Sequence, residues 1–153
     1  MKREDGPSRA AEIAKAVLDS GDLEQMAKTR DYLEREILKK VEATSVNGVN
    51  APRVPNTTNI CFEGVEGEAL QIALDLKGLA VSTGAACSSG AIEPSHVLTA
   101  MGLPADRARA SIRFSLGKQN TTEEAEFANE LIPQVVTRLR DLSPVYNRKA
   151  VSS

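Results

Sequence analysis

Residues 111–116 alternate apolar and polar side chains, and this pattern constrains the fold more than any other part of the chain. Successive side chains of a strand point to opposite faces, so Ile112, Phe114 and Leu116 share one face. The intervening polar residues, with Arg113 at their centre, share the other face. A strand of this type lies with one face against a core and leaves a polar face. We therefore expect a sheet that helices cover on one side.

The remaining patterns predict a two-layer α/β (α+β) domain. Helices are expected over residues 9–18, 22–43, 66–78, 94–102 and 121–142, and strands over residues 58–63, 79–81 and 111–116. Residues 44–57 contain turn signals and are expected to be irregular. The resulting order, α-α-β-α-β-α-β-α, fits a sheet of about three strands with helices on one side. A charged head over residues 1–9, expected to be disordered, and a short tail over residues 147–153 flank the folded part, residues 10–146.

Two capping boxes and one proline predict where two helices begin and where one of them bends. Asp22 with Gln25, and Thr121 with Glu124, have the spacing of capping boxes at helix starts. Pro133 lies inside the last helix, where it is expected to produce a kink. The helix over residues 66–78 is expected to bury all its large apolar side chains and one alanine: Leu70, Ile72, Ala73, Leu74 and Leu76.

Composition excludes several classes of function. A net charge of −2, with basic and acidic residues mixed on helices, argues against a nucleic-acid-binding surface. No apolar run approaches the ~20 residues that span a bilayer, and no apolar signal segment follows the amino terminus, so we expect no membrane association. One histidine and two distant cysteines offer no zinc site. The cysteines lie in unlike contexts, which favours a reducing compartment, the cytoplasm.

Cys87 lies in an unusual setting for a cysteine. Its neighbours on both sides are Gly, Ala, Ser and Thr, which offer no core packing and are typical of an exposed loop. A thiol there can be a nucleophile that reaches a substrate, or an exposed thiol without a role, and local composition leaves both interpretations open. Cys61, between Ile60 and Phe62, is interpreted as a buried structural cysteine.

Arg113 and His96 are the other candidate site residues. Arg113 projects from the polar face of its strand, where a guanidinium can bind a carboxylate through two parallel hydrogen bonds. The alternative is that Arg113 forms a surface ion pair. The strand pattern by itself favours this alternative over carboxylate binding. His96 lies near the expected start of a helix, which favours a structural or surface position over catalysis.

Six short motifs occur in a fixed order along the chain: Val54-Pro-Asn56, Val65-Glu-Gly-Glu68, Val81-Ser-Thr-Gly-Ala-Ala-Cys-Ser-Ser-Gly90, Glu93-Pro-Ser-His-Val-Leu98, Ser111-Ile-Arg-Phe-Ser-Leu-Gly117 and Arg138-Leu-Arg-Asp-Leu-Ser-Pro144. Together they resemble the carboxy-terminal part of the cysteine desulfurases, which take sulfur from L-cysteine for iron–sulfur cluster and thio-cofactor assembly. These enzymes depend on pyridoxal phosphate. The resemblance implies the small domain of the fold-type-I pyridoxal-phosphate-dependent transferases.

The resemblance also implies roles for two residues. In the family, the loop cysteine attacks the sulfur of the cysteine–cofactor adduct and leaves alanine and an enzyme persulfide; here that residue is Cys87. The family's arginine in the Ser-Ile-Arg-Phe-Ser strand binds the substrate carboxylate; here that residue is Arg113. A flexible Ser/Gly loop suits a thiol that visits a buried adduct and then an external acceptor, such as an iron–sulfur scaffold protein. A homodimer is also compatible with the resemblance.

The chain departs from the family in the residues that hold the cofactor. The family holds its cofactor in a large domain that supplies a Schiff-base lysine, a stacking histidine, an aspartate and a phosphate cup, and no matching motif is found here. We therefore expect no covalently held cofactor in this chain, and no desulfurase activity of the chain alone. Two alternatives stay open, a stand-alone persulfide carrier and a non-catalytic interaction or dimerisation domain.

Overall fold

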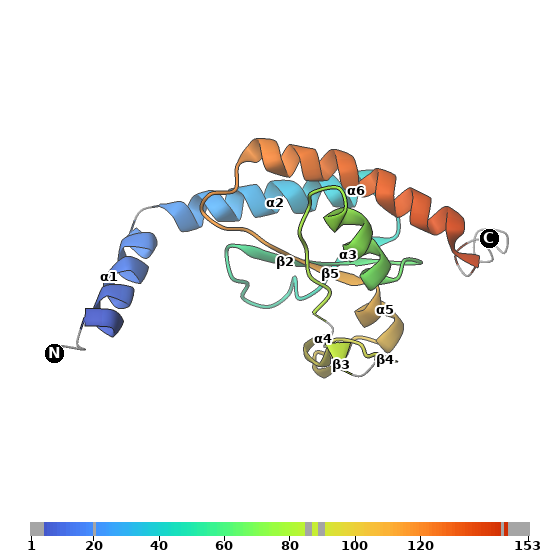
Figure 1. Cartoon of the computed structure of the whole chain (residues 1–153), viewed down its shortest axis with the longest axis horizontal. Helices are drawn as coiled ribbons and strands as arrows, with labels where there is room; N and C mark the ends of the chain where they lie inside the picture. Colours follow the sequence, from blue (N-terminus) through green and yellow to red (C-terminus); the bar gives the residue numbers. More distant parts are fainter. Residues whose placement is uncertain (1–4, 20, 85–86, 89–90, 145, 147–153) are drawn as a thin grey trace.

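A computed structural model describes residues 5–19, 21–84, 87–88, 91–144 and 146 (Figure 1). Its elements, in chain order, are α1 (Asp5–Asp19), α2 (Asp22–Lys40), β1 (Thr44–Val46), β2 (Thr57–Phe62), α3 (Gly67–Asp75), β3 (Cys87–Ser88), β4 (Ala91–Ile92), α4 (His96–Ala100), α5 (Ala105–Arg109), β5 (Ser111–Ser115) and α6 (Thr122–Leu142). The mixed α/β class expected from the sequence is confirmed.

The main sheet has three antiparallel strands in the order β1-β2-β5. Thr44 pairs with Phe62 across β1 and β2, and Asn59 pairs with Arg113 across β2 and β5. The expected strand count is confirmed, but one strand was misplaced. β1 lies inside the segment expected to be irregular, because three residues are too few for a visible alternation. Residues 79–81, expected to form a strand, do not form one.

Helices α2, α3 and α6 cover one face of this sheet, as Figure 1 shows for α2 and α6. Ile60 and Phe62 of β2 and Ile112 of β5 are fully buried against them. The core also contains Ile37 of α2 and Ile132 of α6, both 0% exposed.

Burial follows the alternation around Arg113 of β5, where Ile112 and Phe114 are buried and Arg113 is exposed. It is not one-sided everywhere, because Cys61 of β2 and Ser111 of β5 lie on the opposite face and are fully buried as well. The short helix α5 contacts β2 as well.

Helix α3 buries a narrower stripe than the sequence predicted. Leu70 and Leu74 are fully buried, and Ala73 packs against the core. Ile72 and Leu76, by contrast, are 55% and 83% exposed, so the expectation that they are buried was wrong. Residues four apart, such as Leu70 and Leu74, share a helix face. The prediction treated every apolar residue of the helix as buried and did not consider which face each one occupies.

The bounds and caps of the helices differ from several further expectations. The Thr121–Glu124 capping box is present at α6, but α2 begins after Gly21 without a side-chain cap, so the box predicted for Asp22 was wrong. Helix α6 contains Pro133, and the kink expected there stays a prediction. The helix predicted over residues 94–102 is shorter, and α5 was not predicted. Helix α1 begins at Asp5, inside the predicted head; residues 1–4 and 147–153 lie outside the described residues.

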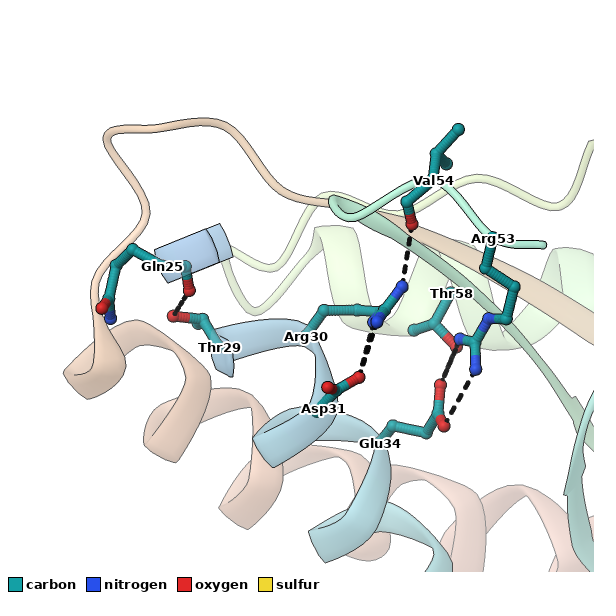
Figure 2. Close-up of polar contacts among 8 residues, drawn as sticks. All are labelled: Gln25, Thr29, Arg30, Asp31, Glu34, Arg53, Val54 and Thr58. Carbon is teal, nitrogen blue, oxygen red and sulfur yellow. Dashed lines mark hydrogen bonds and ion pairs between the residues drawn. The ribbon is translucent and has the colours of Figure 1, made fainter. Parts of the chain in front are cut away.

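A polar cluster fixes the chain between β1 and β2 to helix α2 (Figure 2). The Glu34 carboxylate accepts hydrogen bonds from the Arg53 guanidinium and, at 2.6 Å, from the Thr58 hydroxyl. Arg30 donates from Nη1 to the carbonyl oxygen of Val54 at 2.8 Å. Burial raises the pKa of Glu34, but the hydrogen bonds from Arg53 and Thr58 outweigh it and leave this pKa below its ordinary value. The cluster thereby holds the start of β2 in place.

Candidate functional site

The polar face of the sheet carries Arg113, as the alternation predicted. Ile112 and Phe114, its neighbours on β5, are buried in the core, whereas Arg113 is exposed on the opposite side. Its guanidinium forms no hydrogen bond or ion pair with any residue that the structure describes. All its donors are therefore available to an incoming carboxylate, which a guanidinium binds well in a bidentate geometry.

A hydrogen-bonded network occupies the polar positions beside Arg113. Asn47 donates from Nδ2 to Oδ1 of Asn59 at 2.7 Å and to Oγ of Ser111 at 3.0 Å. The Ser111 hydroxyl donates in turn to the carbonyl oxygen of Arg107 at 2.7 Å. Asn59 lies directly opposite Arg113 in the sheet register. These neighbours satisfy one another and leave the Arg113 side chain outside their network.

The free edge of β5 connects Arg113 to the segment that leads to Cys87. Ser82 donates from its backbone N–H to the carbonyl oxygen of Arg113 at 3.1 Å, and the Arg113 N–H donates to the carbonyl oxygen of Ser82 at 2.6 Å. This isolated antiparallel bridge lies on the edge of β5 opposite β2. Cys87 follows Ser82 by five residues. The backbone that leads to the cysteine is thus fixed to the residue with the free guanidinium.

Cys87 itself lies in β3, where its backbone pairs with that of Ile92 in β4. Residues 85, 86, 89 and 90 lie outside the described residues, and Cys87 is described by its backbone alone. The structure therefore locates the nucleophile predicted from the sequence in a short two-stranded ladder, separate from the main sheet.

Cys61 lies in β2 and is fully buried. Burial raises the pKa of its thiol, and this effect exceeds the opposite effects of Arg107 and Ser111. A thiol held in its protonated form is a poor nucleophile, so the environment of Cys61 agrees with the structural interpretation. His96 is the first residue of α4 and is exposed.

The described residues contain no metal-binding cluster, and none of their lysines lies on a strand with Arg113. No group of three or more His, Cys, Asp or Glu side chains is close enough to hold a metal ion within this part of the chain. The lysines with described positions lie on α1 and α2 or in the turns after α3 and β5, and none lies on a strand near Arg113. Within the same residues, no helix is long and apolar enough to cross a membrane.

Sequence reasoning missed the residues that surround Arg113. Ser82 was inside the motif around Cys87, but nothing in that motif indicated pairing with β5. Asn59 lies in the strand predicted over residues 58–63, but the sequence did not show that this strand pairs with β5 in a register that places Asn59 opposite Arg113. Arg107 lies in a helix that was not predicted, and no sequence signal pointed to it.

Comparison with known proteins identifies relatives. The model of the aminotransferase class-V family matches residues 9–127. The cysteine desulfurase IscS of Dictyoglomus turgidum is 40% identical over 139 residues, which are 91% of this chain and 35% of that protein. A cysteine desulfurase of Enterobacter agglomerans is 48% identical over 122 residues, 80% of this chain and 30% of that protein.

A solved structure supports the same relationship. A NifS-like protein superimposes with a TM-score of 0.69 at 30% sequence identity, covering 86% of this chain and 32% of its own chain. The chain spans about a third of the length of the curated relatives it matches. Since the family model matches well over half of its residues, the chain belongs to the class-V aminotransferase family.

Proposed function

We propose that this chain is part of a cysteine desulfurase, in which it binds the substrate carboxylate and accepts the sulfur atom. The observation that carries the proposal is the environment of Arg113. Its guanidinium is exposed without a partner among the described residues, and its backbone is bonded to the segment that leads to Cys87. The similarity to cysteine desulfurases supports the choice of reaction.

Arg113 is proposed to bind the carboxylate of L-cysteine. A guanidinium is planar and always charged, and its parallel N–H groups match the two carboxylate oxygens. Arg113 projects from a strand that is paired on both edges, by β2 and by Ser82, so its backbone is fixed before the substrate arrives. A fixed guanidinium orients the substrate and limits the directions in which its sulfur atom points.

Cys87 is proposed to accept the sulfur. In the overall reaction, the C–S bond of L-cysteine breaks and an S–S bond forms on Cys87. L-cysteine and the Cys87 thiol become L-alanine and the Cys87 persulfide, so all atoms and electrons balance without an oxidant. The thiolate is the reactive form of a cysteine, and Cys61 is unsuited to this step because it is buried and its pKa is raised.

The cofactor and the sulfur acceptor are proposed to lie outside this chain. Cleavage of the C–S bond requires an electron sink, which pyridoxal phosphate supplies in this family. No motif of this chain matches the family's cofactor-binding residues, so we assign the binding of this group to another part of the complete protein. The persulfide would then pass to an iron–sulfur scaffold or another sulfur-acceptor protein, and the complete protein would act as a homodimer.

A chimera tests this function. The matching segment of the Dictyoglomus turgidum enzyme, 40% identical to this chain, would be replaced by this chain, and L-alanine formation from L-cysteine would be measured. We expect activity in the chimera, its loss in Cys87→Ser, and its retention in the control Cys61→Ser. A folded chimera that forms no alanine, or one whose activity survives Cys87→Ser, would disprove the proposal.

A further inference from the structure

Asn59 of β2 lies beside Arg113 on the polar face of the sheet. The two residues are directly opposite each other in the register of β2 with β5. Directly opposite side chains of an antiparallel pair lie on the same face, with Cβ atoms about 4.5–5.5 Å apart. Cys61 and Ser111, the neighbouring pair on this face, are fully buried, whereas Asn59 is half-buried and Arg113 is exposed. The cover of the polar face therefore ends at the Asn59–Arg113 pair.

A chain of hydrogen bonds that starts at a backbone carbonyl fixes the orientation of the Asn59 amide. The carbonyl oxygen of Arg107 can only accept, so the Ser111 hydroxyl donates its single hydrogen there, at 2.7 Å. Toward Asn47 this hydroxyl is then an acceptor, and Asn47 donates to it from Nδ2 at 3.0 Å. The same Nδ2 donates to Asn59 at 2.7 Å, so Asn59 must present its Oδ1. The Nδ2 atom of Asn59 is therefore turned away from Asn47, and it donates no hydrogen bond within the part of the chain that the structure describes.

Ser82 lies beside Arg113 on the other edge of β5. The two backbones exchange both hydrogen bonds of an antiparallel bridge, so their side chains share one face. Thr83, the next residue, points to the opposite face, because its methyl group would lie 3.5 Å from a Cβ atom on Gly67 of α3. Oγ of Ser82 accepts a hydrogen bond from the N–H of Gly84 at 3.3 Å. Since an N–H can only donate, the hydroxyl hydrogen of Ser82 is left for another acceptor.

A carboxylate accepts more hydrogen bonds than a single bidentate guanidinium supplies. Its two oxygens offer about four acceptor positions, and the pair with Arg113 uses two of them. Asn59 and Ser82 lie on the two sides of Arg113, and each has an unused donor. Oδ1 of Asn59 and Oγ of Ser82 already accept hydrogen bonds, so both side chains offer donors to a ligand. The three residues therefore favour an anion with more than two acceptor positions.

We propose that Asn59 and Ser82 are substrate-binding residues that complete a carboxylate site around Arg113. Arg113 supplies the charge and two parallel donors, and the other two residues each supply one neutral donor, from β2 and from the edge of β5. The inference deepens the proposed function and rests on it for the choice of L-cysteine as the ligand. The preference for a carboxylate rests on the contacts of Asn59, Arg113 and Ser82 alone.

Side-chain NMR signals of the full chain test this site without any catalysis. The amide signals of Asn59 and the Nε–H signal of Arg113 would be assigned from their loss in Asn59→Ala and Arg113→Ala. Both would be followed during a titration with sodium acetate, with sodium chloride as the control for ionic strength. We expect both signals to shift with acetate and to saturate with one dissociation constant, whereas chloride should produce no saturating shift. Amide signals of Asn59 that do not respond to acetate would overturn the site, whether or not Arg113 responds.

The chimera adds a comparison of two substrates, L-cysteine and L-cysteinamide, in which a neutral amide replaces the carboxylate. Asn59→Ala and Ser82→Ala should each lower kcat/KM for L-cysteine about tenfold, because each removes one hydrogen bond to a charged group. Both should change kcat/KM for L-cysteinamide much less. Ser115→Ala is the matched control, since Ser115 is exposed on β5 two residues from Arg113 and shares its face. We expect it to change neither value.

Two results separate this inference from the proposed function. An equal loss of kcat/KM with both substrates in Asn59→Ala and Ser82→Ala would show that these residues support the fold, and it would overturn their role in carboxylate binding. A chimera that forms no alanine would disprove the proposed function, and the acetate titration would then decide the carboxylate site by itself.

Discussion

Replacing Arg113 by alanine in the chimera should weaken catalysis strongly while leaving the fold intact. A hydrogen bond to a charged group contributes about 1.5–3 kcal/mol, and a guanidinium binds a carboxylate through two. Because the two bonds act as one unit, we take a total loss of about 3 kcal/mol, or roughly a hundredfold in kcat/KM. Arg113→Lys keeps the charge but loses the fork, so we expect about a tenfold loss.

The stability of the same variant provides the internal control. The Arg113 side chain is exposed and has no partner among the described residues. The hydrogen bonds between Arg113 and Ser82 join backbone groups only, so the substitution leaves them in place. The free energy of unfolding should therefore change by no more than about 0.5 kcal/mol. The assays are steady-state L-alanine formation over a range of L-cysteine concentrations, and urea unfolding. Unchanged kcat/KM in Arg113→Ala would refute the reasoning, and so would a loss of activity explained by unfolding.

Three further predictions concern the environment of the site. Glu34→Gln should destabilise the chain by about 1 kcal/mol at neutral pH. Because the pKa of Glu34 is lowered in the folded state, this difference in stability should disappear as the pH falls from about 4.3 through that lowered pKa. Equal urea midpoints of both proteins at pH 7 would contradict the prediction. Cys61 should be alkylated by iodoacetamide far more slowly in the folded chain than in urea, as measured by mass spectrometry, because it is buried and its pKa is raised; equal rates would show that its environment is open. Gly67→Ala should destabilise the chain by about 1–3 kcal/mol through overpacking, since its Cβ would meet the carbonyl oxygen of Arg109, and a urea midpoint equal to that of the unsubstituted chain would contradict this clash.

The strand that carries Arg113 was predictable from sequence because its pattern has a short period and one clear buried face. The alternation in residues 111–116 was sufficient to place Arg113 on the polar side and Ile112 in the core. The Thr121–Glu124 capping box was equally readable, since its residues are close in sequence. Local patterns of this kind need no knowledge of the partner elements.

Features that depend on distant partners were not predictable. Ile72 and Leu76 are apolar like Leu70, but they lie on the side of α3 that the core does not reach. The bridge between Ser82 and Arg113 joins residues 31 positions apart, and no periodic pattern in either segment predicts this pairing. The candidate residues themselves were therefore accessible from sequence, whereas the contact that relates them required the fold.

The most direct test of the proposed function is the destination of the sulfur atom. The chimera would be given L-cysteine labelled with a heavy sulfur isotope for a single turnover, and its peptides would be mapped by mass spectrometry without reduction. We predict one labelled sulfur atom on the peptide that contains Cys87 and none on the peptide that contains Cys61. L-alanine formed without label on Cys87, or with label on Cys61, would contradict the assignment of Cys87 as the sulfur acceptor.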